Sequence, residues 1–92
     1  MAKSIIQDTK ECYVTKSRDG LHEHHIFAGS NRKNSERYGL KVYLIPLYHT
    51  GPLGVHSGNK GLNSELKQLA QRKFEEIHGH DKFMQVFRKN YL

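Results

Sequence analysis

One stretch of regularly spaced apolar residues constrains the fold of this chain more than any other feature. Apolar side chains recur every three or four positions between residues 62 and 77, which predicts an amphipathic helix over this range. We expect Asn63 to cap the start of this helix and Gly79 to end it. A shorter helix should follow, with Asp81 as its cap. Its inward-facing residues are expected to be Phe83, Met84 and Phe87.

The N-terminal half of the chain carries strand patterns. Residues 21–27 and 40–44 alternate in character, and this alternation favours two short strands. Residues 11–14 contain Tyr13 and Val14, both strand-forming types, and favour a third. Pro46 should end the 40–44 strand or confine it to a sheet edge.

The connections between these elements are polar or rich in glycine. We expect a flexible loop at residues 29–34 and a single helical turn at residues 35–38, with Gly39 as its left-handed cap. Residues 50–61 contain several glycines and Pro52, which predicts a long loop. Long loops in compact domains are often functional.

The size of the chain limits it to a small fold. A chain of 92 residues fits one domain, residues 1–92, and its hydrophobic content of 36% predicts a thin core. Short strands followed by helices favour the α+β class, with short antiparallel strands, one long helix and a short C-terminal helix.

Charge and cysteine content narrow the possible partners and the compartment. The chain has 15 Lys and Arg against 9 Asp and Glu, a net charge of +6 that suits a polyanion such as nucleic acid. Cys12 is the only cysteine, so no intramolecular disulfide can form. No apolar run approaches a membrane span, and the N-terminal residues lack an apolar signal core. We therefore expect a cytoplasmic protein without a membrane partner.

The most informative polar segment is the pair His24–His25 within the first predicted strand. Successive side chains of a strand point to opposite faces, so the two imidazoles should diverge unless the strand bends. One could then bind a metal while its neighbour reaches a water molecule. His22 shares the face of His24 and could act as an outer-shell group, although polar surface is the favoured interpretation of His22, as it is of His78 and His80.

Two further histidines follow at a distance. His49 comes after the second predicted strand and His56 lies in the glycine-rich loop, so both could join His24. Imidazole suits zinc, nickel and similar metals, whereas magnesium prefers oxygen ligands. Two or three histidine ligands leave coordination positions open, which is typical of a catalytic site rather than a structural one.

Four segments together carry a family resemblance. These are LHEHHIF (21–27), SERYGL (35–40, with Arg32 before it), YLIPLYH (43–49), and GVH (54–56) leading into LKQLAQ (66–71). In this order they resemble small phage and prophage proteins of the HNH, or His-Me finger, nuclease superfamily. The resemblance covers about four-fifths of the chain, with its core at about residues 12–78.

The resemblance implies a fold, a cofactor and residue roles. The fold would be a ββα-metal finger, in which two strands and a helix hold one divalent ion, here Mg²⁺, Mn²⁺, Ni²⁺ or Zn²⁺. His24 would be a metal ligand and His25 the general base. His49 and His56 would complete the ligand set, although His56 follows His49 by a wider gap than is usual in the family. The other ring nitrogen of His25 should donate to a backbone carbonyl.

The chain departs from the family pattern at two places. Many relatives carry a zinc knuckle of two cysteine pairs, but here only Cys12 is kept, and Thr15, Ile45 and Tyr48 stand at the remaining positions. We therefore expect no structural zinc, and expect Ile45 and Tyr48 to pack in the core. The middle Asn of the motif is also missing, since its region reads Gly39–Leu40, so backbone contacts should brace the general base instead.

The implied function is metal-dependent hydrolysis of phosphodiester bonds in DNA. Arg32, Lys33 and Arg37 are the candidate phosphate-binding residues, and phosphate contacts alone predict weak sequence preference. A phage- or prophage-encoded enzyme would act in the host cytoplasm, as a monomer or a homodimer. The alternative is a catalytically inactive HNH-fold module that binds nucleic acid or protein.

Overall fold

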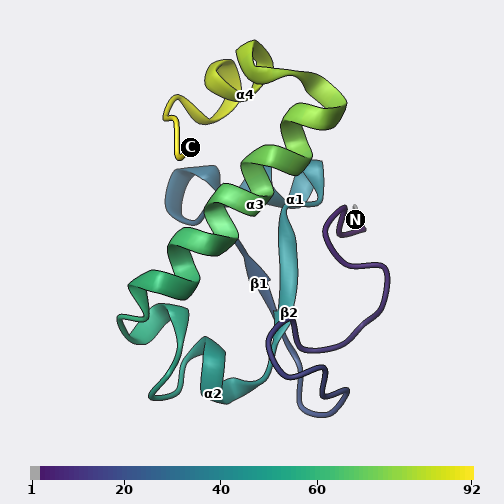
Figure 1. The fold of residues 1–92 in the computed structure, drawn as a ribbon, viewed down its shortest axis with the longest axis vertical. Coiled ribbons are helices and arrows are strands. Elements are labelled where there is room, and N and C mark those ends of the chain that lie inside the picture. Colours follow the sequence, from purple (N-terminus) through teal and green to yellow (C-terminus); the bar gives the residue numbers. More distant parts are fainter. Residues whose placement is uncertain (1–2) are drawn as a thin grey trace.

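The computed structural model describes residues 3–92, which form a small α+β fold (Figure 1). Two antiparallel strands form the sheet, β1 (His22–His25) and β2 (Lys41–Leu44). The helices are η1 (Gly29–Asn31), α1 (Arg32–Tyr38), α2 (Pro46–His49), η2 (Val55–Ser57), α3 (Lys60–His78) and α4 (His80–Phe87). The predicted class, the short antiparallel strands and the two C-terminal helices are confirmed.

Both strands are shorter than the sequence predicts, and the third expected strand is reduced to one bridge, between Cys12 and Tyr43. The backbone N–H of Tyr43 donates to the side-chain oxygen of Gln7, and its carbonyl accepts from Tyr13. One edge of β2 is thus occupied by a side chain and a single backbone bond, so no longer ladder forms there.

The register of the two strands places His24 and His25 on opposite faces of the sheet. His25 lies opposite Lys41, and His24 lies opposite Val42. Because alternate residues face opposite sides, Glu23, His25 and Lys41 share one face, whereas His24 and Val42 share the other. Val42 is fully buried, so the second face is the core side of the sheet.

Helix α1 replaces most of the loop expected at residues 29–34. The chain enters a 3-10 turn at Gly29 and continues directly into α1, so Arg32 and Lys33 lie on a helix and not on a flexible loop. Gly39 ends α1 in the left-handed conformation, with φ of 70°, as predicted. A Cβ at Gly39 would also collide with the carbonyl oxygen of Lys3, so the N-terminal segment packs closely here.

Helix α3 crosses the molecule and contributes buried residues to the same apolar cluster as the sheet (Figure 1). Its N-cap is Asn59, whose side chain accepts the N–H of Leu62, and not Asn63 as expected. The helix therefore begins earlier, and Gly79 ends it as predicted. The buried residues of α3 are Leu66, Ala70, Gln71 and Phe74.

The end of α3 differs from the predicted apolar stripe. Ile77 is 61% exposed, whereas Gln71 is fully buried. The Gln71 amide donates to Asn90 and accepts the N–H of Tyr91, because the C-terminal residues fold back over the helix. The buried stripe of α3 thus ends at Phe74, about one turn earlier than predicted, and it includes the polar residue Gln71.

Helix α4 packs its aromatic side chains inward, as expected. Phe83 and Phe87 are buried and Met84 is partly buried. Gly79 is the N-cap, so Asp81 lies in the first turn of α4 and does not cap it. An acidic residue in the first turn still favours the helix through its dipole.

Cys12 lies in the core, whereas Thr15, which stands at a second knuckle position, is exposed. Its sulfur accepts the backbone N–H groups of Thr15 and Ile45. Ile45 and Tyr48 are partly buried and pack against the apolar cluster, as predicted. Among the helices at residues 3–92, none combines the length and apolar character that a membrane crossing requires.

Candidate active site

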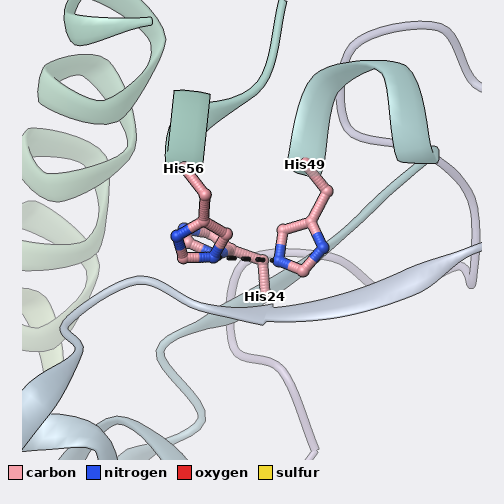
Figure 2. A group of neighbouring side chains, drawn as sticks. All are labelled: His24, His49 and His56. Atoms are coloured by element: carbon pink, nitrogen blue, oxygen red, sulfur yellow. Dashed lines mark hydrogen bonds between the residues drawn. The ribbon is translucent and has the colours of Figure 1, made fainter. Parts of the chain in front are cut away.

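Three imidazole rings from three elements converge beside strand β1 (Figure 2). His24 extends from β1, His49 is the last residue of α2, and His56 lies in η2. Each offers a ring nitrogen, and the three nitrogens lie within 4.8 Å of one another. The structure therefore brings together all three residues that the sequence suggested as metal ligands.

His24 is the most deeply buried of the three histidines. It is only 3% exposed, and within residues 3–92 its Nε2 is buried without a hydrogen-bond partner. Burial, helped by the neighbouring rings of His49 and His56, lowers the pKa of His24 from 6.5 to about 4. The imidazole is thus neutral at pH 7 and keeps a free lone pair. A buried unpaired polar atom is costly, and a bound cation would satisfy it.

The spacing of the rings fits a metal. Nε2 of His49 lies 3.1 Å from Nε2 of His56. Two nitrogens bound to one tetrahedral zinc at about 2.0–2.1 Å lie roughly 3.3 Å apart. Three imidazole nitrogen donors suit zinc, nickel or another borderline ion better than magnesium. Three protein ligands leave at least one position open, as in catalytic sites.

Local backbone features explain how His56 reaches His49 although seven residues separate them. Asn59 donates from its side chain to the carbonyl of Leu53 and at the same time caps α3, which anchors the loop to the helix. A Cβ at Gly54 would collide with the carbonyl oxygen of His49. Only glycine lets the loop approach the end of α2 this closely.

His22 also contacts the cluster. Its Nδ1 lies 3.0 Å from Nδ1 of His49, so both nitrogens of the His49 ring have histidine neighbours. If Nε2 of His49 binds a metal, Nδ1 carries the proton and donates to His22, which fixes the ring orientation. The sequence favours polar surface for His22, whereas the contact with His49 favours an outer-shell group.

His25 lies beside the three-histidine cluster but faces the other side of β1. Both His24 and His25 line one cleft of about 200 Å³, together with Arg32, His49 and His56. The two neighbours can share this cleft because β1 ends at His25 and the chain bends immediately after it.

The ring of His25 is held by acidic side chains. Its Nε2 lies 3.3 Å from Oε1 of Glu36 and 3.7 Å from Oε1 of Glu23. We expected a backbone carbonyl as the partner of the non-catalytic nitrogen, but this contact is to the Glu36 carboxylate instead.

Ser35 braces the segment that follows His25. Its buried hydroxyl accepts the N–H of Phe27 and donates to the carbonyl of the same residue. The backbone N–H of Ile26 donates to Leu40 as well. An expected backbone contact is therefore present after His25, and a serine side chain on α1 adds two further hydrogen bonds.

The three candidate phosphate-binding residues gather next to His25. Arg32, Lys33 and Arg37 line a hollow of about 560 Å³ together with His25 and Glu36. All three belong to α1, so they are held by a helix instead of a loop.

Sequence reasoning missed the residues around His25. Glu36 and Lys41 form a 2.7 Å ion pair, and Glu23 lies 3.4 Å from the same ammonium group. The alternation of Glu23 and His25 along the strand could have indicated their common face. Nothing local in the sequence indicated that α1 would bring Glu36 to the same point.

Comparison of the chain with protein-family models, with curated proteins and with solved structures finds no match.

The lowered pKa of His24 predicts how the stability of the metal-free protein depends on pH. Between about pH 4 and pH 6.5 the unfolded chain binds a proton at His24 that the folded chain excludes. The free energy of unfolding should therefore be highest above pH 6.5 and fall by about 3 kcal/mol as the pH drops to 4. Urea unfolding at a series of pH values measures this dependence.

A variant isolates the contribution of His24 to this curve. His24→Leu removes the titrating ring but keeps an apolar side chain of similar size, so its stability should depend less on pH in the same window. His49, whose pKa is also lowered by burial, contributes a remaining slope of the same sign. Parallel curves for the two proteins would show that His24 is not held neutral.

Proposed function

We propose that this chain is a metal-dependent endonuclease of the HNH type that hydrolyses phosphodiester bonds in DNA. The observation that carries the proposal is the convergence of His24, His49 and His56 beside a cleft that His25 also lines, with the buried Nε2 of His24 lacking a hydrogen-bond partner within residues 3–92. The order of these histidines along the chain is the order that the HNH resemblance implies.

The proposed cofactor is one divalent ion held by the three histidines. Such an ion, when bound, supplies positive charge that stabilises the phosphorane-like transition state and the departing oxygen. Transition metals such as Mn²⁺, Ni²⁺ and Zn²⁺ suit three imidazoles best. The ββα-metal finger would then consist of β1, β2 and the α2–η2 segment that leads into α3, with His56 supplied by η2.

His25 is the proposed general base. Its ring would accept a proton from the water molecule that attacks phosphorus, which requires a nitrogen within hydrogen-bond reach of that water. His25 is suited to this task because it lines the same cleft as the metal ligands yet is not one of the three convergent rings.

Arg32, Lys33 and Arg37 are the proposed phosphate contacts. They line the hollow that adjoins His25, and arginine side chains can bind phosphate through two parallel hydrogen bonds. The net charge of +6 adds long-range attraction to DNA. Contacts of this kind position the backbone without reading bases, so sequence preference should be weak.

One observation favours the alternative, an inactive HNH-fold module that binds nucleic acid or protein. His25 is already engaged by Glu36, and its side chain is only 10% exposed. A ring held in this way could be structural. The alternative predicts DNA binding or protein binding without cleavage.

Nicking of a supercoiled plasmid, run beside a gel shift with the same DNA, separates the two possibilities. The wild-type protein, first stripped with a chelator, should nick the plasmid after addition of Mn²⁺, Ni²⁺, Zn²⁺ or Mg²⁺, and excess chelator should stop the reaction. A gel shift without nicking at every metal would overturn the nuclease proposal in favour of the binding module.

A further inference from the structure

The face of β1 opposite the metal ligands carries a compact set of charged residues around His25. Glu23 and His25 alternate along β1, and the strand register puts Lys41 of β2 directly opposite His25. Glu36 reaches the same point from α1, the helix that connects the two strands. Side chains from three consecutive elements therefore meet at one imidazole.

Two of these side chains form a fixed ion pair. Nζ of Lys41 donates to Oε2 of Glu36 at 2.7 Å, and the Lys41 side chain is only 5% exposed. Burial opposes the charge of Lys41, but the hydrogen bond to Glu36 and the charges of Glu23 and Glu36 outweigh burial and raise its pKa. The Lys41 hydrogen bond in turn lowers the pKa of Glu36. Glu36 is thus an ionised carboxylate held in one orientation.

The second oxygen of this carboxylate determines which ring nitrogen of His25 carries the proton. Oε1 of Glu36 lies 3.3 Å from Nε2 of His25. An ionised carboxylate can only accept hydrogen bonds, so Nε2 of His25 must carry the proton. In the neutral ring the free lone pair then lies on Nδ1, which is the nitrogen left to accept a proton from water.

The same geometry argues against a second metal ion among Glu23, His25 and Glu36. These three residues offer ligand atoms close together, but the ammonium group of Lys41 already lies within 3.4 Å of a carboxylate oxygen of each glutamate. A divalent ion there would be repelled by a buried positive charge.

We propose that Glu36, held by Lys41, is the positioning residue for His25 and that Nδ1 of His25 is the basic nitrogen. The catalytic part of this inference rests on the proposed nuclease function, whereas the hydrogen bond between Glu36 and His25 is independent of that function. Glu36 would fill the role of the Asn that the chain lacks, since it fixes both the ring and the proton on it. Outer-shell carboxylates that orient a histidine act in the same way in metal sites.

Nitrogen-15 NMR of the imidazole rings in the metal-free, DNA-free protein tests the hydrogen bond directly. The spectra are recorded at about pH 8.5, above the ordinary imidazole pKa of about 6.5. We expect wild-type His25 to show a protonated Nε2 whose N–H signal exchanges slowly with water. Glu36→Ala should broaden this signal through faster exchange, and Glu36→Gln should partly retain it because the amide oxygen can still accept. A bare Nε2 with the proton on Nδ1 would overturn the proposal.

Cleavage kinetics on the same variants test the catalytic consequence. Glu36→Ala should lower kcat roughly ten- to a hundredfold with little change in KM or metal affinity, and Glu36→Gln should recover part of the loss. Glu76→Gln, at an exposed carboxylate of α3, is the matched control and should cleave like the wild type. Wild-type kcat in Glu36→Ala would contradict the positioning role. If the wild type itself cleaves no DNA, the nuclease proposal fails, and the NMR result still decides whether Glu36 fixes the ring.

Discussion

Replacing His25 with alanine is expected to lower the rate of DNA cleavage by about 10²–10⁴-fold, the usual contribution of a positioned general base. The ring lines the cleft together with the three convergent histidines and Arg32, and among the described residues it is the one imidazole outside the ligand set that does so. Metal affinity should remain unchanged, because the His25 ring is held by Glu36 and Glu23 and not by the metal ligands. Single-turnover nicking of a plasmid at saturating metal measures the loss.

A matched histidine variant controls for the effect of removing any imidazole. His80→Ala removes a ring at the start of α4, where its side chain is 53% exposed and contacts only Glu75 among the acidic residues at positions 3–92. This variant should cleave like the wild type. Equal cleavage by His25→Ala and the wild type would remove His25 from the reaction, whatever the metal result.

Replacing His24 with alanine is expected to weaken binding of Zn²⁺ or Ni²⁺ roughly tenfold or more. Loss of outer-shell partners alone costs about 10–100-fold, and His24 would be a direct ligand. The effect should be large because the Nε2 of His24 is buried, neutral and without another partner within the described residues. Calorimetric titration of the chelator-treated protein measures the affinity.

A second variant keeps this test independent of folding, since removal of a buried ring can destabilise the core. His56 is exposed in η2, so His56→Ala should leave the fold intact and still lower the affinity for the metal. A ligand that binds only the folded state raises stability by about 2.7 kcal/mol at a hundred times its Kd. The melting temperature of the wild type should therefore rise with added metal and that of His56→Ala should rise less. Equal affinities in all three proteins would exclude this cluster as the metal site.

The parts of the fold that follow from local patterns are the parts that the sequence predicts. The α3 helix has the 3.6-residue period over several turns, and Gly39 and Gly79 mark helix ends because glycine tolerates the conformations needed there. The second strand is confirmed to within one residue, since an alternating pattern ended by Pro46 leaves few alternatives. The early start of helix α1 could not be predicted, because its first residues are polar and show no apolar periodicity.

The parts that depend on contacts between distant residues are not predictable in this way. Asn59 and not Asn63 caps α3, because Asn59 also anchors the loop at Leu53. Gln71 is buried because residues 90 and 91 return to meet it. A polar residue within an apolar stripe gives no signal of such a partner.

The candidate site shows the same division. His24, His25, His49 and His56 were singled out from their types, their order and the family resemblance, and the structure brings the three expected ligands together. The bracing of His25 by Glu36 depends on the path of α1 between the two strands. No spacing rule relates a strand residue to a helix residue eleven positions later, so the sequence alone could not reveal this contact.

Measuring DNA cleavage as a function of bound metal is the most direct test of the proposal that one metal ion per chain is required for nuclease activity. The chelator-treated wild-type protein is loaded with increasing amounts of Mn²⁺ or Ni²⁺, and bound metal and the rate of plasmid nicking are measured on the same samples. We predict that nicking rises with bound metal and saturates at one ion per chain. Saturated metal binding without any nicking, or nicking that does not change with bound metal, would contradict the account.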